Sequence, residues 1–286
     1  MEPFIAEENT QNPPLLYLPK WTKRFPNLTA GFTTRLGGVG GGRFASLNCA
    51  LHVGDNAADV LANRAIVARA IGMEADSWTC AEQVHGCKVA CVGRADKGKG
   101  RLSRASAVGE FDALITVEKG VLLTAFFADC VPLYFLDPEH EAIAIAHAGW
   151  RGTAQNIVHK TVQALAAQFG SDPAKLSAAI GPAIGPCCYE VGDDVVSAIA
   201  AQLGENREKI AKVEQLPPSA DGKTAKTLLD LKEANRQFMI KAGILPANIE
   251  ISRRCTSCDS RLFFSHRRDG GPTGRMAAWI GWKDGG

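Results

Sequence analysis

The sequence lacks three features that mark large classes of proteins: a strong net charge, an uninterrupted apolar run, and an apolar leader at its start. It carries 32 basic and 30 acidic residues, a formal net charge of +2, which is too small to indicate a nucleic-acid or membrane partner by itself. The longest apolar stretch, residues 121–136, is interrupted by Asp129 and Pro132 and is too short to span a bilayer. The first residues include Glu2 and Glu7 and do not resemble the basic start of a signal peptide. We therefore expect a cytoplasmic protein with no membrane partner.

What the sequence does contain is the composition of a globular enzyme with a sizeable core. Its 286 residues are 46% hydrophobic and 22% charged, which allows one large domain or two small ones. Its nine cysteines cannot all pair within the chain, so reduced thiols in the cytoplasm are the better interpretation. Residues 1–20 contain Pro13, Pro14 and Pro19 and predict a loosely ordered lead-in.

Short apolar runs and a few helical patterns follow along the chain. Apolar residues recur at helical spacing after Asn56 and after Gly152, and a glycine ends each pattern. Closely spaced strands in the middle of the chain predict a mixed sheet that is buried on both faces. The polar residues 94–110 are predicted to form a mobile loop. The expected helices are residues 56–71, 152–169, 191–203 and 228–242, and the expected strands are residues 28–34, 78–84, 88–92, 112–117, 121–127, 131–136, 142–146, 176–180, 249–252 and 276–282.

Three residues are candidate metal ligands because each ends a short hydrophobic run in a polar, turn-like setting. They are His85, Cys130 and His147. Two imidazoles and one thiolate suit a tetrahedral zinc ion, and three protein ligands leave one position open, as in catalytic zinc sites. Cys130 and His147 are separated by one strand-turn-strand unit, so a hairpin can bring both to one edge of a sheet.

Two neighbours of these residues have alternative interpretations. Asp129 is either a strand-end carboxylate bound to backbone amides, or an acceptor for a ligand histidine or a general base. Gln83 lies two residues before His85, so in a strand it shares a face with His85 and could bind substrate through its amide.

The glycine-rich segment 37–42 invites a nucleotide-binding interpretation that its details oppose. The third glycine of the dinucleotide fingerprint is missing, and Arg43-Phe44 replaces the Lys-Ser/Thr of the phosphate-binding loop. A loop flanked by Arg35 and Arg43 remains, which could hold a phosphate as an anion nest.

For two further clusters of residues we favour a structural interpretation over a functional one. Cys187-Cys188 and the pair Cys255 and Cys258 could form a second zinc site, but the usual spacing needs a second Cys-x-x-Cys, so small, partly buried thiols are the preferred interpretation. An arginine-rich region with aromatic residues could bind single-stranded nucleic acid, but acidic residues interrupt it, which favours paired charges in a turn. Its residues are Arg253, Arg254, Arg261, Phe263, Phe264, Arg267, Arg268 and Arg275.

Several short sequence motifs, taken in their order along the chain, resemble those of a known family. They are Gly31–Gly38, Ser46-Leu47-Asn48, Val53-Gly54-Asp55, the motifs around His85, Cys130 and His147, Ala179–Val191 and Phe264–Gly270. Together they resemble the laccase-domain family of multicopper-polyphenol-oxidase-like proteins, also described as purine nucleoside phosphorylases of the macrophage-immunometabolism-regulator type. The resemblance implies an α+β fold, a single-domain layered α/β/β/α sandwich with mixed sheets over residues 21–286, shared with cysteine-hydrolase toxin domains.

The resemblance also implies a site. His85, Cys130 and His147 carry over from the family as metal ligands and catalytic residues, with zinc as the metal and copper as a possible alternative. Residues in or beside these motifs are expected to contact substrate or phosphate. They are Arg35, Asn48, Gln83, Asp129 and Arg151.

The implied activity is phosphorolysis of adenosine, inosine and S-methyl-5'-thioadenosine to base plus (thio)ribose 1-phosphate, with adenosine deamination as a second activity. The expected partners are nucleosides and phosphate, with no nucleic acid; the oligomeric state, the preferred nucleoside and the native metal stay open. A multicopper centre needs many histidines and the chain has six, so polyphenol oxidation would be incidental to one exchangeable metal. The alternatives are a hydrolase with Cys130 as nucleophile and His147 as base, including an amidase acting on peptidoglycan precursors, and a nucleic-acid binder using the arginine-rich region.

Overall fold

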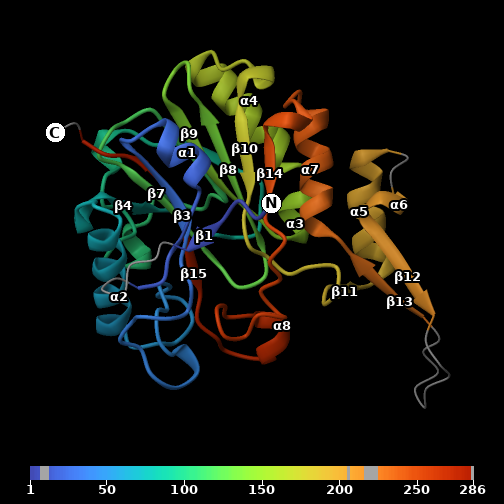
Figure 1. Ribbon diagram of the computed structural model, residues 1–286, viewed down its shortest axis with the longest axis horizontal. Coiled ribbons are helices and arrows are strands. Elements are labelled where there is room, and N and C mark those ends of the chain that lie inside the picture. Colours follow the sequence, from blue (N-terminus) through green and yellow to red (C-terminus); the bar gives the residue numbers. More distant parts are fainter. Residues whose placement is uncertain (7–12, 205–206, 216–224, 285–286) are drawn as a thin grey trace.

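Two six-stranded sheets pack face to face at the centre of the structure, and helices cover their outer faces (Figure 1). The computed structural model describes residues 1–6, 13–204, 207–215 and 225–284. Each sheet contains both parallel and antiparallel neighbours. In the first, for example, β7 (Leu122–Phe127) pairs in parallel with β4 (Trp78–Cys80) and antiparallel with β15 (Met276–Trp282). The predicted single-domain α/β/β/α sandwich with mixed sheets is therefore confirmed.

The first sheet is built from strands that lie far apart in the sequence. Its central strand β15 pairs with both β3 and β7, so the end of the chain lies between its beginning and its middle. In spatial order its strands are β1 (Ile5–Ala6), β2 (Leu16–Tyr17), β3 (Leu28–Phe32), β15 (Met276–Trp282), β7 (Leu122–Phe127) and β4 (Trp78–Cys80).

The second sheet is arranged around an antiparallel hairpin. In spatial order its strands are β14 (Ile249–Ile251), β10 (Ser177–Ile180), β8 (Val131–Asp137), β9 (Ala142–Ala148), β6 (Ala113–Thr116) and β5 (Val89–Cys91). A small third sheet, which the sequence did not predict, joins β11 (Glu190–Val191), β13 (Ala225–Leu229) and β12 (Ala211–Gln215).

Helices form the two outer layers. The helix α2 covers the first sheet, where Val67 joins Trp78 and Trp279 in one buried cluster. The helices α4 and α7 cover the second sheet, and Val162 and Phe238 pack in a cluster with its strands. The helices are α1 (Pro19–Arg24), α2 (Ala57–Ala70), α3 (Trp150–Ala154), α4 (Ile157–Phe169), α5 (Asp193–Leu203), α6 (Arg207–Ile210), α7 (Leu231–Lys241) and α8 (His266–Asp269).

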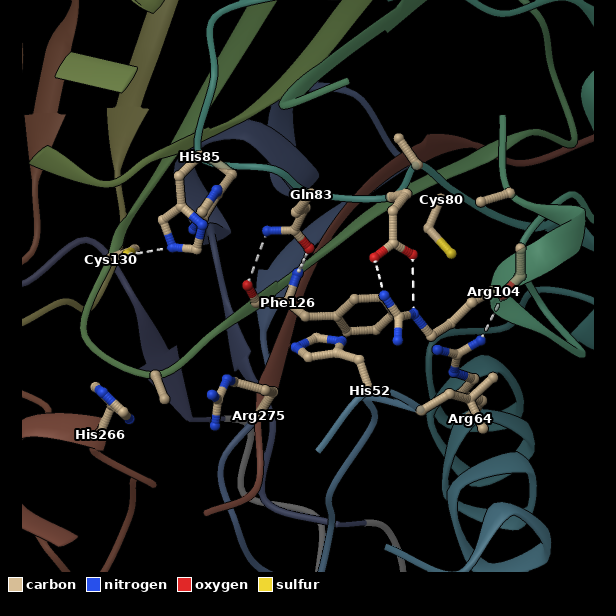
Figure 2. A pocket seen from close by; sticks show the side chains of 17 residues that line it. His52, Arg64, Cys80, Gln83, His85, Arg104, Phe126, Cys130, His266 and Arg275 are labelled. Atoms are coloured by element: carbon tan, nitrogen blue, oxygen red, sulfur yellow. Dashed lines mark hydrogen bonds and ion pairs between the residues drawn. The ribbon is translucent and has the colours of Figure 1, made fainter. Parts of the chain in front are cut away.

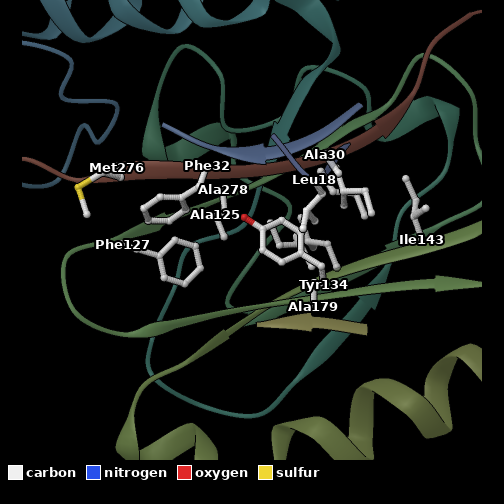
Figure 3. Packing of buried hydrophobic residues seen from close by; sticks show 14 of the residues in the cluster. Leu18, Ala30, Phe32, Ala125, Phe127, Tyr134, Ile143, Ala179, Met276 and Ala278 are labelled. Atoms are coloured by element: carbon white, nitrogen blue, oxygen red, sulfur yellow. The ribbon is translucent and has the colours of Figure 1, made fainter. Parts of the chain in front are cut away.

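The space between the sheets is filled by apolar side chains from both inner faces (Figure 3). Phe32 and Phe127 of the first sheet lie with ring centroids 6.0 Å apart. Tyr134 of the second sheet crosses the interface, and its hydroxyl donates to the carbonyl of Gly31 at 2.8 Å. Because this buried hydroxyl is satisfied only across the two sheets, the bond fixes how the sheets lie relative to each other.

Two predicted helices differ from the structure. The pattern over residues 152–169 forms two helices, because Asn156 takes the left-handed conformation (φ 58°) and its side chain caps α4 by accepting from the backbone N–H of His159. The pattern over residues 228–242 begins as strand β13, and α7 starts only after Asp230, which accepts from the backbone N–H of Glu233.

The described part of the first twenty residues packs against the rest of the fold, in contrast to the loosely ordered lead-in that the sequence predicted. The strands β1 and β2 extend the first sheet, and Phe4, Leu16 and Leu18 are buried. Their apolar side chains close the end of the inter-sheet core, which outweighs the proline content that suggested disorder.

Within the described residues, the structure contains no helix long and apolar enough to cross a membrane.

Candidate metal centre

The β8–β9 hairpin brings two predicted ligands to one edge of the second sheet. Cys130 directly precedes β8, and His147 lies near the end of β9. Antiparallel pairing sets Val131 opposite Ala148 and Pro132 opposite His147. The expectation that a hairpin joins these two residues is confirmed.

The third predicted ligand reaches this edge from a segment that crosses between the sheets. His85 lies in the loop from β4 of the first sheet to β5 of the second, and its φ of 58° is unusual for a residue with a side chain. The carboxylate of Asp112 accepts backbone N–H groups from His85 at 3.0 Å and from Gly86 at 2.6 Å. These bonds hold the loop in the conformation that directs the His85 ring toward Cys130 (Figure 2).

The three side chains have the spacing of a single metal site. One ligand atom from each of His85, Cys130 and His147 lies within 4.8 Å of the others. His85 Nε2 is 3.9 Å from Cys130 Sγ, and a nitrogen and a sulfur bound to one tetrahedral zinc ion are about 3.6 Å apart. The donor set therefore fits one ion with only small side-chain movements.

Asp112 is a site residue that the sequence did not reveal. It lies just before β6, which pairs with β9, so its carboxylate faces His147 and is 2.8 Å from Nδ1 of that ring. An imidazole that donates from Nδ1 to a carboxylate presents Nε2 to a metal, with its orientation fixed. The available signal was an acidic residue directly before a buried strand, in Phe111-Asp112-Ala113.

The electrostatics of the cluster favour a charged thiolate. Burial raises the pKa of Cys130, but the positive charge of His147 and hydrogen bonds from both histidines outweigh it and lower the pKa to about 6. Burial lowers the pKa of His147, but the Cys130 thiolate and Asp112 raise it to about 9. In the absence of a metal the two groups thus stabilise each other as an ion pair.

Close packing at the site requires one glycine. A Cβ atom on Gly149 would lie 2.9 Å from Cδ2 of His85 and 3.2 Å from Sγ of Cys130.

Two backbone positions at the site are strained: His85, with a φ of 58°, and Asp129, directly before Cys130, with a φ of 92°. Such strain persists only where surrounding contacts hold it, and it is typical of functional sites.

A cavity of about 440 Å³ opens beside the three candidate ligands (Figure 2). This volume suits a small organic ligand. Its walls come from the loops after β4 and β7, from α2, from the segment 100–107 and from the chain around β15. The lining residues are Leu51, His52, Arg64, Cys80, Ala81, Glu82, Gln83, His85, Gly100, Arg104, Ala107, Phe126, Ala128, Cys130, His147, His266 and Arg275.

Three arginines line this cavity, and sequence reasoning assigned none of them to the site. Arg64 is buried and donates to the carbonyls of Cys49 and Gly100, and Arg104 is paired with Glu82. Arg275 is held from two sides: Nη1 donates to the carbonyls of Thr273 and Gly274, and its backbone N–H donates to Asn48. Arg275 therefore presents a positioned guanidinium group at the cavity wall (Figure 2).

His52, another lining residue, is a neutral group. Burial and the positive charge of Arg275 together lower its pKa to about 4. Its ring lies 6.4 Å from that of Phe126, in an edge-on arrangement. The cavity therefore combines a neutral imidazole and an aromatic ring with nearby cationic groups: Arg64 lies over the Phe126 ring at 4.8 Å.

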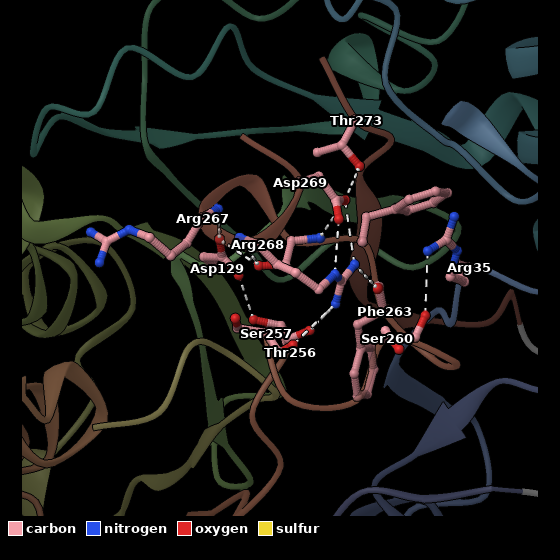
Figure 4. Close-up of polar contacts among 12 residues, drawn as sticks. Arg35, Asp129, Thr256, Ser257, Ser260, Phe263, Arg267, Arg268, Asp269 and Thr273 are labelled. Carbon is pink, nitrogen blue, oxygen red and sulfur yellow. Dashed lines mark hydrogen bonds and ion pairs between the residues drawn. The ribbon is translucent and has the colours of Figure 1, made fainter. Parts of the chain in front are cut away.

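The structure places Gln83 and Asp129 beside the site but engages their polar atoms in the fold. Gln83 lines the cavity, yet its amide bonds both the N–H and the carbonyl of Phe126. Asp129 is buried and accepts from the hydroxyls of Thr256 and Ser265 and from the backbone N–H of Arg267 (Figure 4). The acceptor for a ligand histidine is Asp112, not Asp129.

The remaining predicted contacts lie outside the set of residues that line the cavity. The Arg35 guanidinium donates to the carbonyls of Ala45 and Ser260 and lies over the Phe264 ring. Arg151 is exposed and lies over the ring of its neighbour Trp150. Asn48 is fully buried, and its contact with the cavity is indirect, through Arg275.

The arginine-rich region forms an internally bonded loop (Figure 4). Arg268 donates to the carbonyls of Thr256 and Phe263 and pairs with Asp269. Arg267 donates to the carbonyl of Glu190 and lies over the Tyr189 ring. The Arg268–Asp269 pair fits the paired-charge interpretation that the sequence favoured, whereas Arg267 is held by a backbone carbonyl and a ring.

Within the described residues, the structure shows two groups of possible metal ligands, the His85-Cys130-His147 cluster and a group of four cysteines. The remaining histidines, among them His140 and His159, join neither group. One ion at the histidine cluster is consistent with these ligands, and a multicopper centre would need more histidines than gather there.

We expect Cys130 in metal-free protein to react with iodoacetamide at a rate that falls as the pH drops through about 6, because its thiolate persists down to that pH. Cys91, whose side chain reaches solvent, is an internal control. Partial burial raises its pKa above the ordinary 9, and Asp96 and Glu118 add to the effect. As the pH is lowered, labelling of Cys91 should therefore be lost at a higher pH than labelling of Cys130. Peptide mass spectrometry across a pH series measures both. Coinciding pH curves for the two thiols would contradict the thiolate at Cys130.

Comparison of the sequence and the structure with known proteins identifies similar proteins and a family. Purine nucleoside phosphorylase YlmD of Geobacillus stearothermophilus is 45% identical over 260 residues, which cover 91% of this chain and 92% of that protein. Adenosine deaminase RL5, from an unknown prokaryotic organism, is 33% identical over 250 residues, covering 87% of this chain and 92% of that protein. The crystal structure of YlmD from Geobacillus stearothermophilus has a TM-score of 0.88 and 42% identity, covering 99% of this chain and 100% of that one. Because the model of the family described as multi-copper polyphenol oxidoreductase laccase matches residues 29–283, the chain belongs to that family.

Proposed function

We propose that the chain is a metal-dependent enzyme of purine nucleosides. Its main reaction is phosphorolysis of adenosine, inosine and S-methyl-5'-thioadenosine to base plus (thio)ribose 1-phosphate, and its second is deamination of adenosine. The observation that carries the proposal is the placement of His85, Cys130 and His147 in the wall of a cavity large enough for a nucleoside. The relatives named purine nucleoside phosphorylase and adenosine deaminase support the substrate class.

The metal that fits this ligand set is zinc. The residues that would hold it are His85, Cys130 and His147, with Asp112 orienting the ring of His147. A zinc ion bound there would supply Lewis acidity toward a polar atom of the substrate. The lowered pKa of Cys130 keeps its thiolate available as a ligand at neutral pH.

The purine base is expected beside His52 and Phe126 in the cavity wall. His52 carries no charge at neutral pH, so it can donate or accept a hydrogen bond without attracting an anion. Phe126 offers an apolar ring beside it. A base placed there has Arg275 in the same cavity, and the charge of Arg275 already acts on His52.

Phosphate is expected at Arg275. Phosphorolysis breaks the bond between the purine nitrogen and C1′ of the sugar and forms a bond between C1′ and a phosphate oxygen. The departing base takes up a proton. The Arg275 guanidinium donates to the carbonyls of Thr273 and Gly274, and its backbone N–H donates to Asn48, so the side chain can hold the phosphate dianion at one position during this exchange.

One observation favours a second candidate, a cysteine hydrolase. Asp112, His147 and Cys130 form a connected series in which the carboxylate orients the imidazole and the imidazole stabilises a thiolate. This is the order of groups in nucleophilic cysteine enzymes. In that reaction Cys130 would attack a carbonyl carbon, as an amidase acting on peptidoglycan precursors requires, and no metal would be needed.

The direct test supplies adenosine to zinc-loaded and to chelator-treated protein, each with and without phosphate, and resolves the products. We expect adenine and ribose 1-phosphate only when phosphate is present, inosine in either case, and loss of both activities on chelation with recovery on adding zinc. Full activity on adenosine after chelation would contradict the metal-dependent enzyme. Amide cleavage of a peptidoglycan precursor by chelator-treated protein, with an acyl adduct on Cys130, would instead support the hydrolase.

Replacing Arg275 by alanine is expected to raise the phosphate concentration needed for phosphorolysis roughly ten- to hundredfold, because a charge-assisted hydrogen bond contributes about 1.5–3 kcal/mol. Phosphate-free deamination should change much less. Arg24→Ala, which removes an exposed arginine from α1, is the control for surface charge. A raised phosphate requirement in Arg35→Ala or Arg151→Ala, with none in Arg275→Ala, would place the anion where the sequence suggested.

A further inference from the structure

Four cysteines from two distant loops meet away from the cavity. Cys187 and Cys188 lie in the loop after β10, and Cys255 and Cys258 lie in the loop after β14. The strands β10 and β14 are parallel neighbours, so both loops leave the same end of the second sheet. All four sulfur atoms lie within 4.8 Å of one another, and none of the four cysteines lines the cavity.

The distances suit a shared metal ion. The sulfur of Cys258 is 3.4 Å from those of both Cys187 and Cys188, whereas a disulfide bond brings two sulfurs to about 2.05 Å. Two thiolates bound to one tetrahedral zinc ion are about 3.8 Å apart. The four sulfurs are therefore close to the corners of a single four-cysteine site.

The surroundings favour negative charge at this position. The backbone N–H of Gly185 donates to the sulfur of Cys255 at 3.2 Å, and such bonds stabilise a metal-bound thiolate. The ammonium group of Lys232 is buried and donates to the carbonyls of Ser252 and Arg254, in the segment that leads into Cys255. A zinc ion with four thiolates keeps an excess negative charge, which this buried cation offsets.

We propose that Cys187, Cys188, Cys255 and Cys258 form a second metal site, a closed four-thiolate zinc site with a structural role. The sequence favoured unliganded thiols because it shows only one Cys-x-x-Cys. The adjacent pair supplies the other two ligands because the loop after β10 folds back against the loop after β14. In that contact Thr256 donates its backbone N–H to the carbonyl of Ala183 at 3.1 Å.

The site would brace one side of the catalytic cavity. The loop that carries Cys255 and Cys258 also carries Thr256, whose hydroxyl donates to Asp129 at 2.7 Å, directly before Cys130 (Figure 4). Arg267, which follows the cavity residue His266, donates to the carbonyl of Cys188 at 3.4 Å. A metal that joins the two loops would thus hold the backbone beside Cys130 and His266 in place.

Metal counting on the full-length protein tests the site. Zinc-replete wild type should carry about two zinc ions per chain. Cys258→Ser and Cys130→Ala should each lose one, and the double variant should lose both. Cys91→Ser, which removes an exposed cysteine outside both clusters, should keep both ions. If the histidine cluster binds no metal, Cys258→Ser alone would remove all zinc, so the two proposals fail separately.

Thiol mapping on the wild type keeps the test valid if Cys258→Ser does not fold. In zinc-replete protein the four cysteines should resist alkylation while Cys91 reacts, and a chelator should expose all four. Labelling of Cys187 and Cys258 as fast as Cys91 with zinc present would overturn the site. So would a mass deficit of two hydrogens that maps to a disulfide among the four cysteines in protein purified under reducing conditions, or a zinc content that Cys258→Ser leaves unchanged.

Discussion

The carboxylate of Asp112 is the contact on which the candidate centre depends. One oxygen accepts from the His85 backbone and faces Nδ1 of His147, and the other accepts from Gly86. A single buried group therefore fixes the loop that carries one histidine and the ring orientation of the other. Burial raises the pKa of Asp112, but its bonds with His147 and the backbone amides outweigh this and lower it, so the group stays charged.

The two-sheet architecture explains why the ligands meet at this place. His85 and Cys130 both lie where the chain leaves the first sheet and enters the second, after β4 and β7 respectively. His147 lies at the end of β9, beside that crossing. The inter-sheet core, with Tyr134 bonded to Gly31, holds the two crossings at a fixed separation. Buried strands thus give the ligand residues a rigid base, which a metal site requires.

The sequence predicted the candidate ligand cluster and the layers better than the residues that line the cavity. His85, Cys130 and His147 each end an apolar run, so short-range pattern and motif were enough to find them. Asp112 and Arg275 were missed because their roles arise from strand pairing and from contacts between segments far apart in the sequence. The same holds for the four cysteines, which come together only through the neighbouring ends of β10 and β14. The predicted helix over residues 152–169 is divided into two helices because Asn156 has a left-handed backbone conformation. The periodicity of apolar residues does not reveal this conformation.

The most direct measurement is the zinc affinity of Asp112→Asn, determined by competition with a chromophoric chelator. Asp137→Asn is the matched control, because Asp137 binds backbone amides and Nδ1 of His140 in the same way at the opposite end of the β8–β9 hairpin. If Asp112 organises the centre, its variant binds zinc at the histidine cluster about 10- to 100-fold more weakly, and Asp137→Asn binds as wild type does. Equal zinc affinity in Asp112→Asn and wild type would contradict the account.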